Sequence, residues 1–119
     1  MASPPSTTTE RQRLTQCTAY PNLDRLFIIT SARVTKINWA STGSHPVASG
    51  VTFVPMDDST NEYVVNVERD VVLSAGTVQT PALLELSGVG NPAILNPLGI
   101  QTVVDLPGVG ENLQDHPVR

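Results

Sequence analysis

The chain has 119 residues, which is enough for at most one small domain. Aromatic residues make up only 4% of the sequence, so a hydrophobic core would be built from Val, Leu and Ile. A net charge of -4 argues against nucleic-acid and membrane-surface partners, because both require a basic face. The single Cys17 excludes an intramolecular disulfide framework. No apolar run approaches the roughly 20 residues of a transmembrane helix.

The beginning of the chain carries no signal for regular structure. Residues 1–19 are expected to be a flexible lead-in, since residues 1–13 are polar and lack any periodicity. This segment has no apolar stretch of the kind that defines a signal peptide. A partial chain would lack such a segment in any case, so we predict no cellular location.

The next part of the chain is predicted to be a sheet. Leu26–Thr30 is a short, continuous apolar run, as in a strand covered on both faces. Residues 33–68 then predict a β-meander of three antiparallel strands joined by two turns. Its last strand, Glu62–Glu68, alternates, with Tyr63, Val65 and Val67 facing inward. Gly50 indicates a bulge or a close approach of two backbones.

Helices are predicted after the meander. Residues 70–75 look like a buried parallel strand, the last of the sheet. Thr80 is a suitable N-cap and Pro81 a suitable first residue for a helix over 80–87, which Gly88 would end. A second short helix is predicted over Ala93–Asn96. Residues 107–117 are rich in Gly and Pro and predict a loop that lies close to another group.

Two glycine pairs raise the question of a nucleotide site. Gly88-Val89-Gly90 and Gly108-Val109-Gly110 each match half of the dinucleotide-binding fingerprint. Neither has the third glycine or the preceding strand, so we reject both as the primary phosphate loop. Turns and helix stops are the simpler interpretation. The junction Ala75–Pro81 is a better candidate for an anion, since a helix N-terminus there would present unpaired N–H groups.

The candidate catalysts are few. His45 is expected in a solvated turn, while His116 follows Asp115 and could serve either in acid–base chemistry or in a structural role. The nucleophile motif Gly-x-Ser-x-Gly is absent, which gives no case for a hydrolase. No Cys/His cluster indicates a metal.

Gly76–Gly90 resembles the second signature of the glucose-methanol-choline (GMC) family of FAD-dependent oxidoreductases. Every constrained position is filled, including Thr80-Pro81, Leu83-Leu84 and Ser87-Gly88-Val89-Gly90. The flanks are similar to the family as well, and the resemblance covers about residues 20–119. It implies an α/β fold, or α+β if the chain folds in isolation, and a partial FAD-binding domain belonging to a doubly wound unit.

The resemblance implies cofactor contacts at particular residues. The family holds the adenine end of FAD partly through a backbone valine, which matches Val34. Ser74, Ala75 and Gly76 would pass near the ADP half of FAD. The loop over residues 107–117 would help to cover the cofactor, with contacts expected from Asn112, Asp115 and His116.

The family's pyrophosphate loop and catalytic histidine have no counterpart in this sequence, and His116 does not match the catalytic position. We therefore expect a middle section of a longer enzyme that oxidises the CH–OH group of a small alcohol with FAD. Alone, the chain is expected to be inactive, marginally stable, and weak or deficient in FAD binding. The alternative is a non-catalytic, β-rich interaction module derived from such an enzyme. Neither the substrate nor the oligomeric state is predicted.

Overall fold

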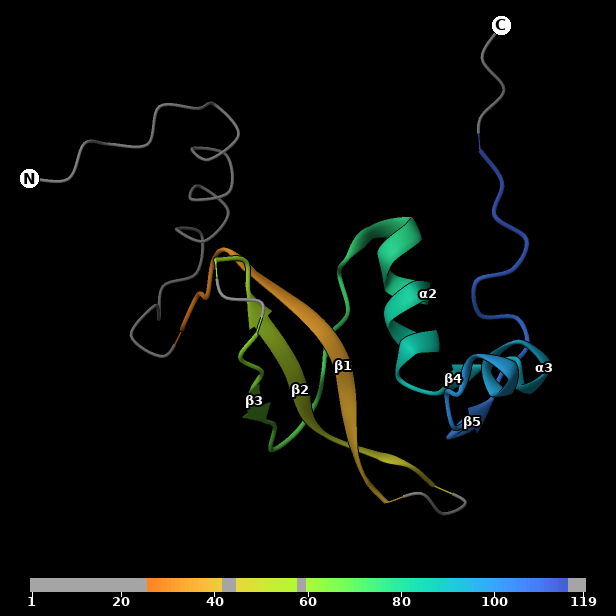
Figure 1. Ribbon diagram of the computed structural model, residues 1–119, viewed down its shortest axis with the longest axis horizontal. Helices are drawn as coiled ribbons and strands as arrows, with labels where there is room; N and C mark the ends of the chain where they lie inside the picture. Colours follow the sequence, from red (N-terminus) through yellow and green to blue (C-terminus); the bar gives the residue numbers. More distant parts are fainter. Residues whose placement is uncertain (1–25, 42–44, 58–59, 116–119) are drawn as a thin grey trace, which may run out of the picture. The chain divides into compact units, whose positions relative to one another are not determined.

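The computed structural model describes residues 26–41, 45–57 and 60–115. The chain divides into two units, residues 1–30 and 31–119, of which the second contains all the helices and strands described below. Figure 1 shows that the second unit combines a sheet with a helix beside it and a group of short elements beyond that helix. The lead-in predicted over residues 1–19 and Cys17 lie outside the described residues.

The sheet is an antiparallel meander, as the sequence predicted. It consists of β1 (Ala32–Ser41), β2 (Val47–Pro55) and β3 (Tyr63–Asn66), in the order β1-β2-β3 (Figure 1). Because β2 is the central strand, one edge of β1 is left without a strand partner in this sheet.

The register of β1 and β2 contains a bulge at Thr35. Val34 is opposite Phe53 and Lys36 is opposite Thr52, so Thr35 is an extra residue on β1. The Thr35 hydroxyl donates to the Thr52 carbonyl at 3.3 Å, which ties the bulge to the partner strand. A bulge of this kind shifts the alternation of the strand by one residue.

Gly50 confirms the prediction of a close backbone approach. A Cβ atom at this position would lie 2.4 Å from the carbonyl oxygen of Val65 on β3. Gly50 is paired with Asn66 on one side and with Asn38 on the other. Only a residue without a side chain therefore fits at this position of the central strand.

The prediction of a buried face on the third strand was wrong. All four residues of β3 are exposed, including Tyr63 and Val65, although Val67 just beyond it is half-buried. Tyr63 stacks on Phe53 with ring centroids 5.6 Å apart. This contact stabilises the pairing of β2 with β3 but leaves Tyr63 exposed. The alternation in the sequence therefore does not produce a buried face, because no described layer covers that side of β3.

Helix α2 (Gly76–Leu86) begins four residues earlier than the sequence predicted. Ala75 is its N-cap, so Thr80 does not cap the helix and Pro81 lies inside it. Pro81 lacks the N–H that would bond to the carbonyl of Thr77, which removes one helical hydrogen bond. The predicted end was correct, since Ser87 is the C-cap and Gly88 follows with φ of +87°.

Short elements follow α2. β4 (Val89–Gly90) pairs in parallel with β5 (Val104–Asp105). Between them lie α3 (Pro92–Leu95) and the 3-10 helix η2 (Asn96–Leu98), so the predicted second helix is confirmed to within one residue at each end. The Asn91 side chain accepts a hydrogen bond from the N–H of Ala93 at 3.0 Å and caps α3.

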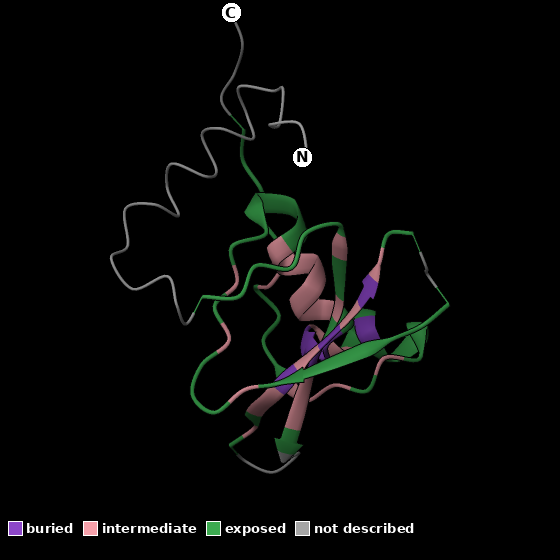
Figure 2. Ribbon diagram, turned by 90° about the vertical axis from the view of Figure 1, so that its left-hand side faces the viewer, coloured by how far each residue is buried: buried purple, intermediate pink, exposed green. Residues whose placement is uncertain are grey.

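The core is small. Among the described residues, the buried apolar side chains are Ile37 on β1, Val54 on β2, Val89 on β4 and Leu95 on α3. Figure 2 shows these buried segments along the sheet and beside the end of α2. Ser87 is as deeply buried as Leu95, with an exposed fraction of 1% for each.

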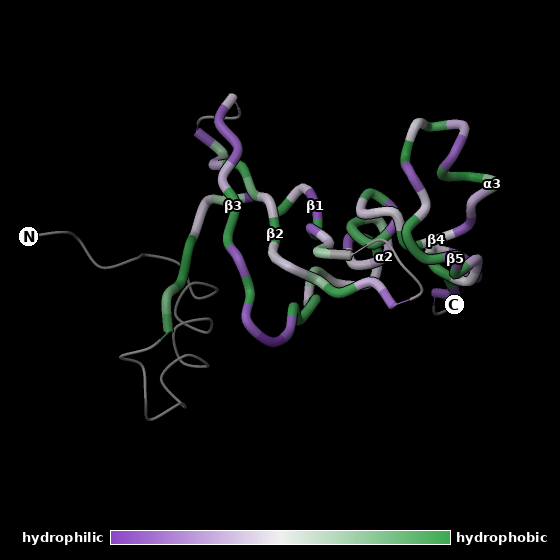
Figure 3. Tube along the Cα trace, turned by 90° about the horizontal axis from the view of Figure 1, so that it is seen from below, coloured by the Kyte–Doolittle hydropathy of each residue, from purple (hydrophilic) through white to green (hydrophobic). Residues whose placement is uncertain are grey.

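Two predicted strands do not form. Leu26–Thr30 is apolar throughout its first four residues (Figure 3), yet it has no strand conformation and those four side chains are exposed. Residues 70–75 also form no strand, although Val71 and Leu73 are half-buried while Val72 between them is exposed. Both runs have the composition of sheet strands. A strand requires a hydrogen-bonding neighbour, and the described part of the chain provides none for them.

The close contact of Gly50 with β3 yields a stability prediction. We expect Gly50→Ala to lower the free energy of unfolding by about 2 kcal/mol or more, because its methyl group would collide with the Val65 carbonyl. Gly108→Ala is the matched control, since a Cβ there would meet no atom within 4 Å. It should change stability by no more than about 0.5 kcal/mol. Urea unfolding of both variants measures the difference, and equal losses would contradict the prediction.

Candidate cofactor-binding site

One side of α2 forms a groove with β1. The groove is lined on α2 by residues spaced four and three apart, which puts them on one stripe of the helix. We call it the β1 groove, and its volume is about 660 Å³. Its lining consists of Arg33, Val34, Thr35, Ala75, Gln79, Leu83 and Leu86.

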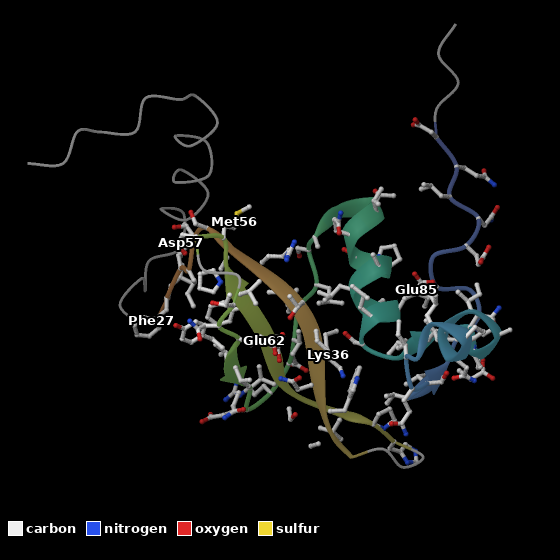
Figure 4. The ribbon with its side chains drawn as sticks, viewed as in Figure 1. Phe27, Lys36, Met56, Asp57, Glu62 and Glu85 are labelled. Atoms are coloured by element: carbon white, nitrogen blue, oxygen red, sulfur yellow. The ribbon has the colours of Figure 1, made fainter. Side chains whose placement is uncertain are left out.

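The opposite side of α2 forms a second groove with the loop that follows β5. This loop groove has a volume of about 490 Å³ and is lined by Thr77, Val78, Pro81, Ala82, Glu85 and residues 110–114. Glu85 points from α2 toward this loop (Figure 4). A Cβ on Gly110 would lie 2.9 Å from a carboxylate oxygen of Glu85, so the loop backbone passes directly over that side chain.

The main chain of Val34 faces the β1 groove. The N–H of Ile37 donates to Ser87, so it points away from β2 toward the open edge of β1. Amide directions alternate along a strand, and the bulge makes Thr35 and Lys36 count as one step. The backbone N–H and C=O of Val34 therefore point to the same open edge of β1 as the N–H of Ile37. A donor and an acceptor of the backbone are thus presented at the wall of the groove.

The predicted site residues fall into separate groups. Val34 and Ala75 both line the β1 groove, while Asn112 lines the loop groove on the other side of α2. Ser74 is exposed just before α2, and Gly76 is the first residue of that helix with φ of +87°. Asp115 is exposed and lines neither groove, and His116 lies outside the described residues.

Sequence reasoning missed five residues of the β1 groove: Arg33, Thr35, Gln79, Leu83 and Leu86. Gln79 and Leu83, together with Leu86, form its helical wall, and Arg33 brings a positive charge to its β1 wall. The signal for Gln79 and Leu83 was their spacing, because residues four apart lie on one helix face. It was overlooked because the helix was predicted to begin at Thr80, which left Gln79 outside it.

Ser87 joins the two walls of the β1 groove. Its Oγ accepts a hydrogen bond from the N–H of Ile37 at 2.8 Å and donates one to the carbonyl of Leu83 at 2.6 Å. Its own carbonyl accepts from Nε1 of Trp39 at 2.7 Å. We call this set of three hydrogen bonds the Ser87 clasp. It fastens β1 to the last turn of α2 and satisfies a carbonyl at the helix end.

The two glycines after Ser87 allow the chain to pack immediately behind the clasp. A Cβ on Gly88 would lie 2.5 Å from the carbonyl oxygen of Gln101, and one on Gly90 would lie 3.3 Å from Leu95 and Glu85. The Gly88 carbonyl accepts hydrogen bonds from the amides of Val103 and Val104. The glycines of Ser87-Gly88-Val89-Gly90 are therefore explained by close packing at the end of α2.

The described residues offer little else of chemical note. No group of three or more His, Cys, Asp or Glu side chains among them is placed to hold a metal ion. Their helices are also too short or too polar to cross a membrane.

Comparison with solved structures gives the class of protein. An FAD-dependent oxidoreductase from Chaetomium thermophilum superposes with a TM-score of 0.73 and 36% identity, over 89% of this chain and 17% of that one. The grooves and the meander therefore belong to an α/β fold found in FAD-dependent oxidoreductases, which confirms the predicted fold class.

The family follows from the sequence. The family model described as GMC oxidoreductase matches residues 6–118, and the chain belongs to the GMC oxidoreductase family. A GMC oxidoreductase family protein from Malassezia sympodialis is 42% identical over 91 residues, which are 76% of this chain and 15% of that protein. An oxygen-dependent choline dehydrogenase from Acinetobacter baumannii is 40% identical over 108 residues, or 91% of this chain and 18% of that protein. The chain thus spans less than a fifth of the length of these relatives.

The turn after Ser87 yields a second stability prediction. Gly88→Ala combines a left-handed backbone with a collision against the Gln101 carbonyl, so we expect a loss of about 3 kcal/mol or more in unfolding free energy. Gly99→Ala has the same unfavourable backbone, with φ of +76°, but open space around the new methyl group. It should cost only about 1–2 kcal/mol. Thermal melts of the two variants separate strain from collision, and equal costs would contradict the packing role of Gly88.

Proposed function

We propose that this chain is part of the FAD-binding domain of an oxidoreductase that acts on the CH–OH group of a small alcohol. Membership of the GMC family and likeness to solved FAD-dependent oxidoreductases support FAD as the cofactor. The relative named choline dehydrogenase supports a small alcohol as the substrate. The observation that carries the proposal is the β1 groove, which unites Val34 and Ala75 as the family resemblance requires.

The β1 groove fits the adenine end of FAD. An adenine ring offers a hydrogen-bond donor and acceptors on its edge, and the outward-facing main chain of Val34 complements both. The groove is lined mostly by apolar groups, with Leu83 and Leu86 on α2, which suits a flat aromatic ring. Because the contact uses main-chain atoms, the side chain of Val34 is left with no required role.

Arg33 supplies the charge that a dinucleotide needs. FAD carries a pyrophosphate, and a guanidinium is well suited to phosphate oxygens. Arg33 is exposed beside Val34, at the rim of the β1 groove. It is the one cation lining that groove among the described residues, so we assign it the phosphate side of the ADP group.

The loop after β5 covers a further part of the cofactor in this proposal. Asn112 lines the loop groove, where its side-chain oxygen accepts a hydrogen bond from Gln114 at 3.1 Å. Asp115 and His116 follow directly and would extend the same cover. Bound FAD supplies the hydride acceptor for alcohol oxidation, while the residues described here bind and orient it.

The coding sequence around this chain tests the proposal. Extending the reading frame in both directions should reveal a strand followed by Gly-x-Gly-x-x-Gly upstream and a histidine-bearing substrate domain downstream. Protein expressed from the longest such frame should contain bound flavin. A frame that encodes only these residues, with no flavin uptake, would favour the non-catalytic interaction module.

The backbone contact at Val34 can be tested by removing its N–H. In protein from the longest reading frame, Val34→Pro should weaken FAD binding about fivefold, because one hydrogen bond of about 1 kcal/mol is lost. Val34→Ala should change affinity by less than about twofold, since only the side chain is altered. Titration of the apoprotein with FAD, followed by flavin fluorescence, gives both dissociation constants.

A control tests whether proline itself is tolerated at the open edge. Proline is accepted in an edge strand where the missing N–H faces away from the sheet. Val34→Pro should therefore melt close to the wild type, whereas Lys36→Pro, whose N–H faces β2, should melt at a clearly lower temperature. If Val34→Pro binds FAD as tightly as Val34→Ala, the main-chain contact is refuted.

A further inference from the structure

The walls of the β1 groove come from two elements that are far apart in the sequence. One wall is the stretch Arg33–Thr35 of β1, and the other is the helix stripe that includes Gln79 and Leu83. Among the described residues β1 has no strand partner on this side, so its distance from α2 depends on contacts between the strand and the helix. Those contacts determine whether the groove keeps the width that a ligand needs.

The Ser87 clasp makes that connection. In the described part of the chain, the hydrogen bonds that tie β1 to the end of α2 go to Ser87, from the N–H of Ile37 and from Nε1 of Trp39. The same Oγ donates to the carbonyl of Leu83, whose side chain lines the groove. One hydroxyl therefore bonds to the strand and to a wall residue of the helix at once.

The burial of Ser87 makes the connection stiff. Only 1% of its surface is exposed, so water cannot replace the hydroxyl as the partner of the Ile37 amide. An unpaired buried N–H is unfavourable, and the strand would have to move to reach another acceptor or solvent. The open edge of β1 that carries Val34 would move with it, since Val34 is the next residue along the bulged strand whose backbone groups face the same edge as those of Ile37.

We propose that Ser87 is a positioning residue for the cofactor: its hydroxyl holds the open edge of β1 at a fixed distance from α2 and so sets the width of the β1 groove. The inference rests on the proposed function, because it assigns FAD to that groove. Ser87 itself is not among the residues that line the groove. Its effect is transmitted through Ile37 and Leu83.

The test uses protein from the longest reading frame that contains this chain, with FAD as the probe. Ser87→Ala removes the hydroxyl and should raise the dissociation constant for FAD about tenfold or more, because the Val34 contact and the helical wall separate. Hydrogen exchange measured by mass spectrometry on the apoprotein should be faster in peptides that cover β1 and the last turn of α2.

A matched control separates positioning from a general loss of stability. Asn91→Ala also removes a side-chain hydrogen bond, the cap of α3, and Asn91 does not line the β1 groove. It should lower the melting temperature but leave the FAD dissociation constant within about twofold of the wild type. Both variants are compared well below their melting temperatures.

A rescue variant asks whether the hydroxyl itself is responsible. Ser87→Thr keeps an oxygen that can bond to the carbonyl four residues before it, a common arrangement for Thr in helices. We expect it to melt below the wild type because of the added methyl group, yet to bind FAD within about threefold of it. If Ser87→Ala fails to fold, Trp39→Phe loosens the clasp by one bond and should weaken FAD binding about threefold.

The outcomes distinguish the two proposals. If the wild-type protein takes up no FAD, the proposed function fails, and the assignment of Ser87 fails with it. If the wild type binds FAD and Ser87→Ala binds it equally well, only the inference about Ser87 is overturned. The same holds if Asn91→Ala, at an equal loss of thermal stability, weakens FAD binding as much as Ser87→Ala does.

Discussion

The hydrogen bond from the Ile37 amide to the Ser87 hydroxyl determines how the two main parts of this structure meet. The meander and α2 are separated by a long stretch without regular structure, so the chain alone does not hold them together. Ser87 does so where the end of α2 and the open edge of β1 both have backbone groups to satisfy. The two elements joined there are the walls of the β1 groove, although Ser87 is not among the residues that line it.

The glycines beside Ser87 serve the same junction from the other side. Gly88 lets the chain turn sharply at the helix end and lie against the strand that leads to β5, and Gly90 leaves room for Leu95 and Glu85. A sequence motif that looks like half of a dinucleotide fingerprint is thus explained by packing. In this chain the signature packs the end of α2 against the stretch that leads to β5.

Much of the fold could be predicted from local patterns. Turn residues and alternation gave the meander, Asn91 and Pro92 gave the start of α3, and Gly88 gave the end of α2, because each of these signals acts within a few residues. The two apolar runs were interpreted as strands because composition indicates a strand but cannot supply its partner. The β1 groove was foreseen only at Val34 and Ala75, through the family resemblance. Ser87 was seen as part of a motif, but its role requires Ile37, fifty residues away in the sequence, to be in contact with it.

The extra residue in β1 has a consequence for how this strand can change. Val34 and Ile37 are an odd number of positions apart, so in a regular strand they would face opposite edges. Thr35 brings them to the same edge, which lets one strand both hold the helix and present its backbone to the groove. Without the bulge at Thr35, the backbone groups of Val34 and Ile37 would face opposite edges of β1, so the strand could not both bond to Ser87 and present Val34 to the groove. The length of this short stretch is therefore under tighter constraint than the identity of its side chains, and a deletion there would do more harm than almost any substitution.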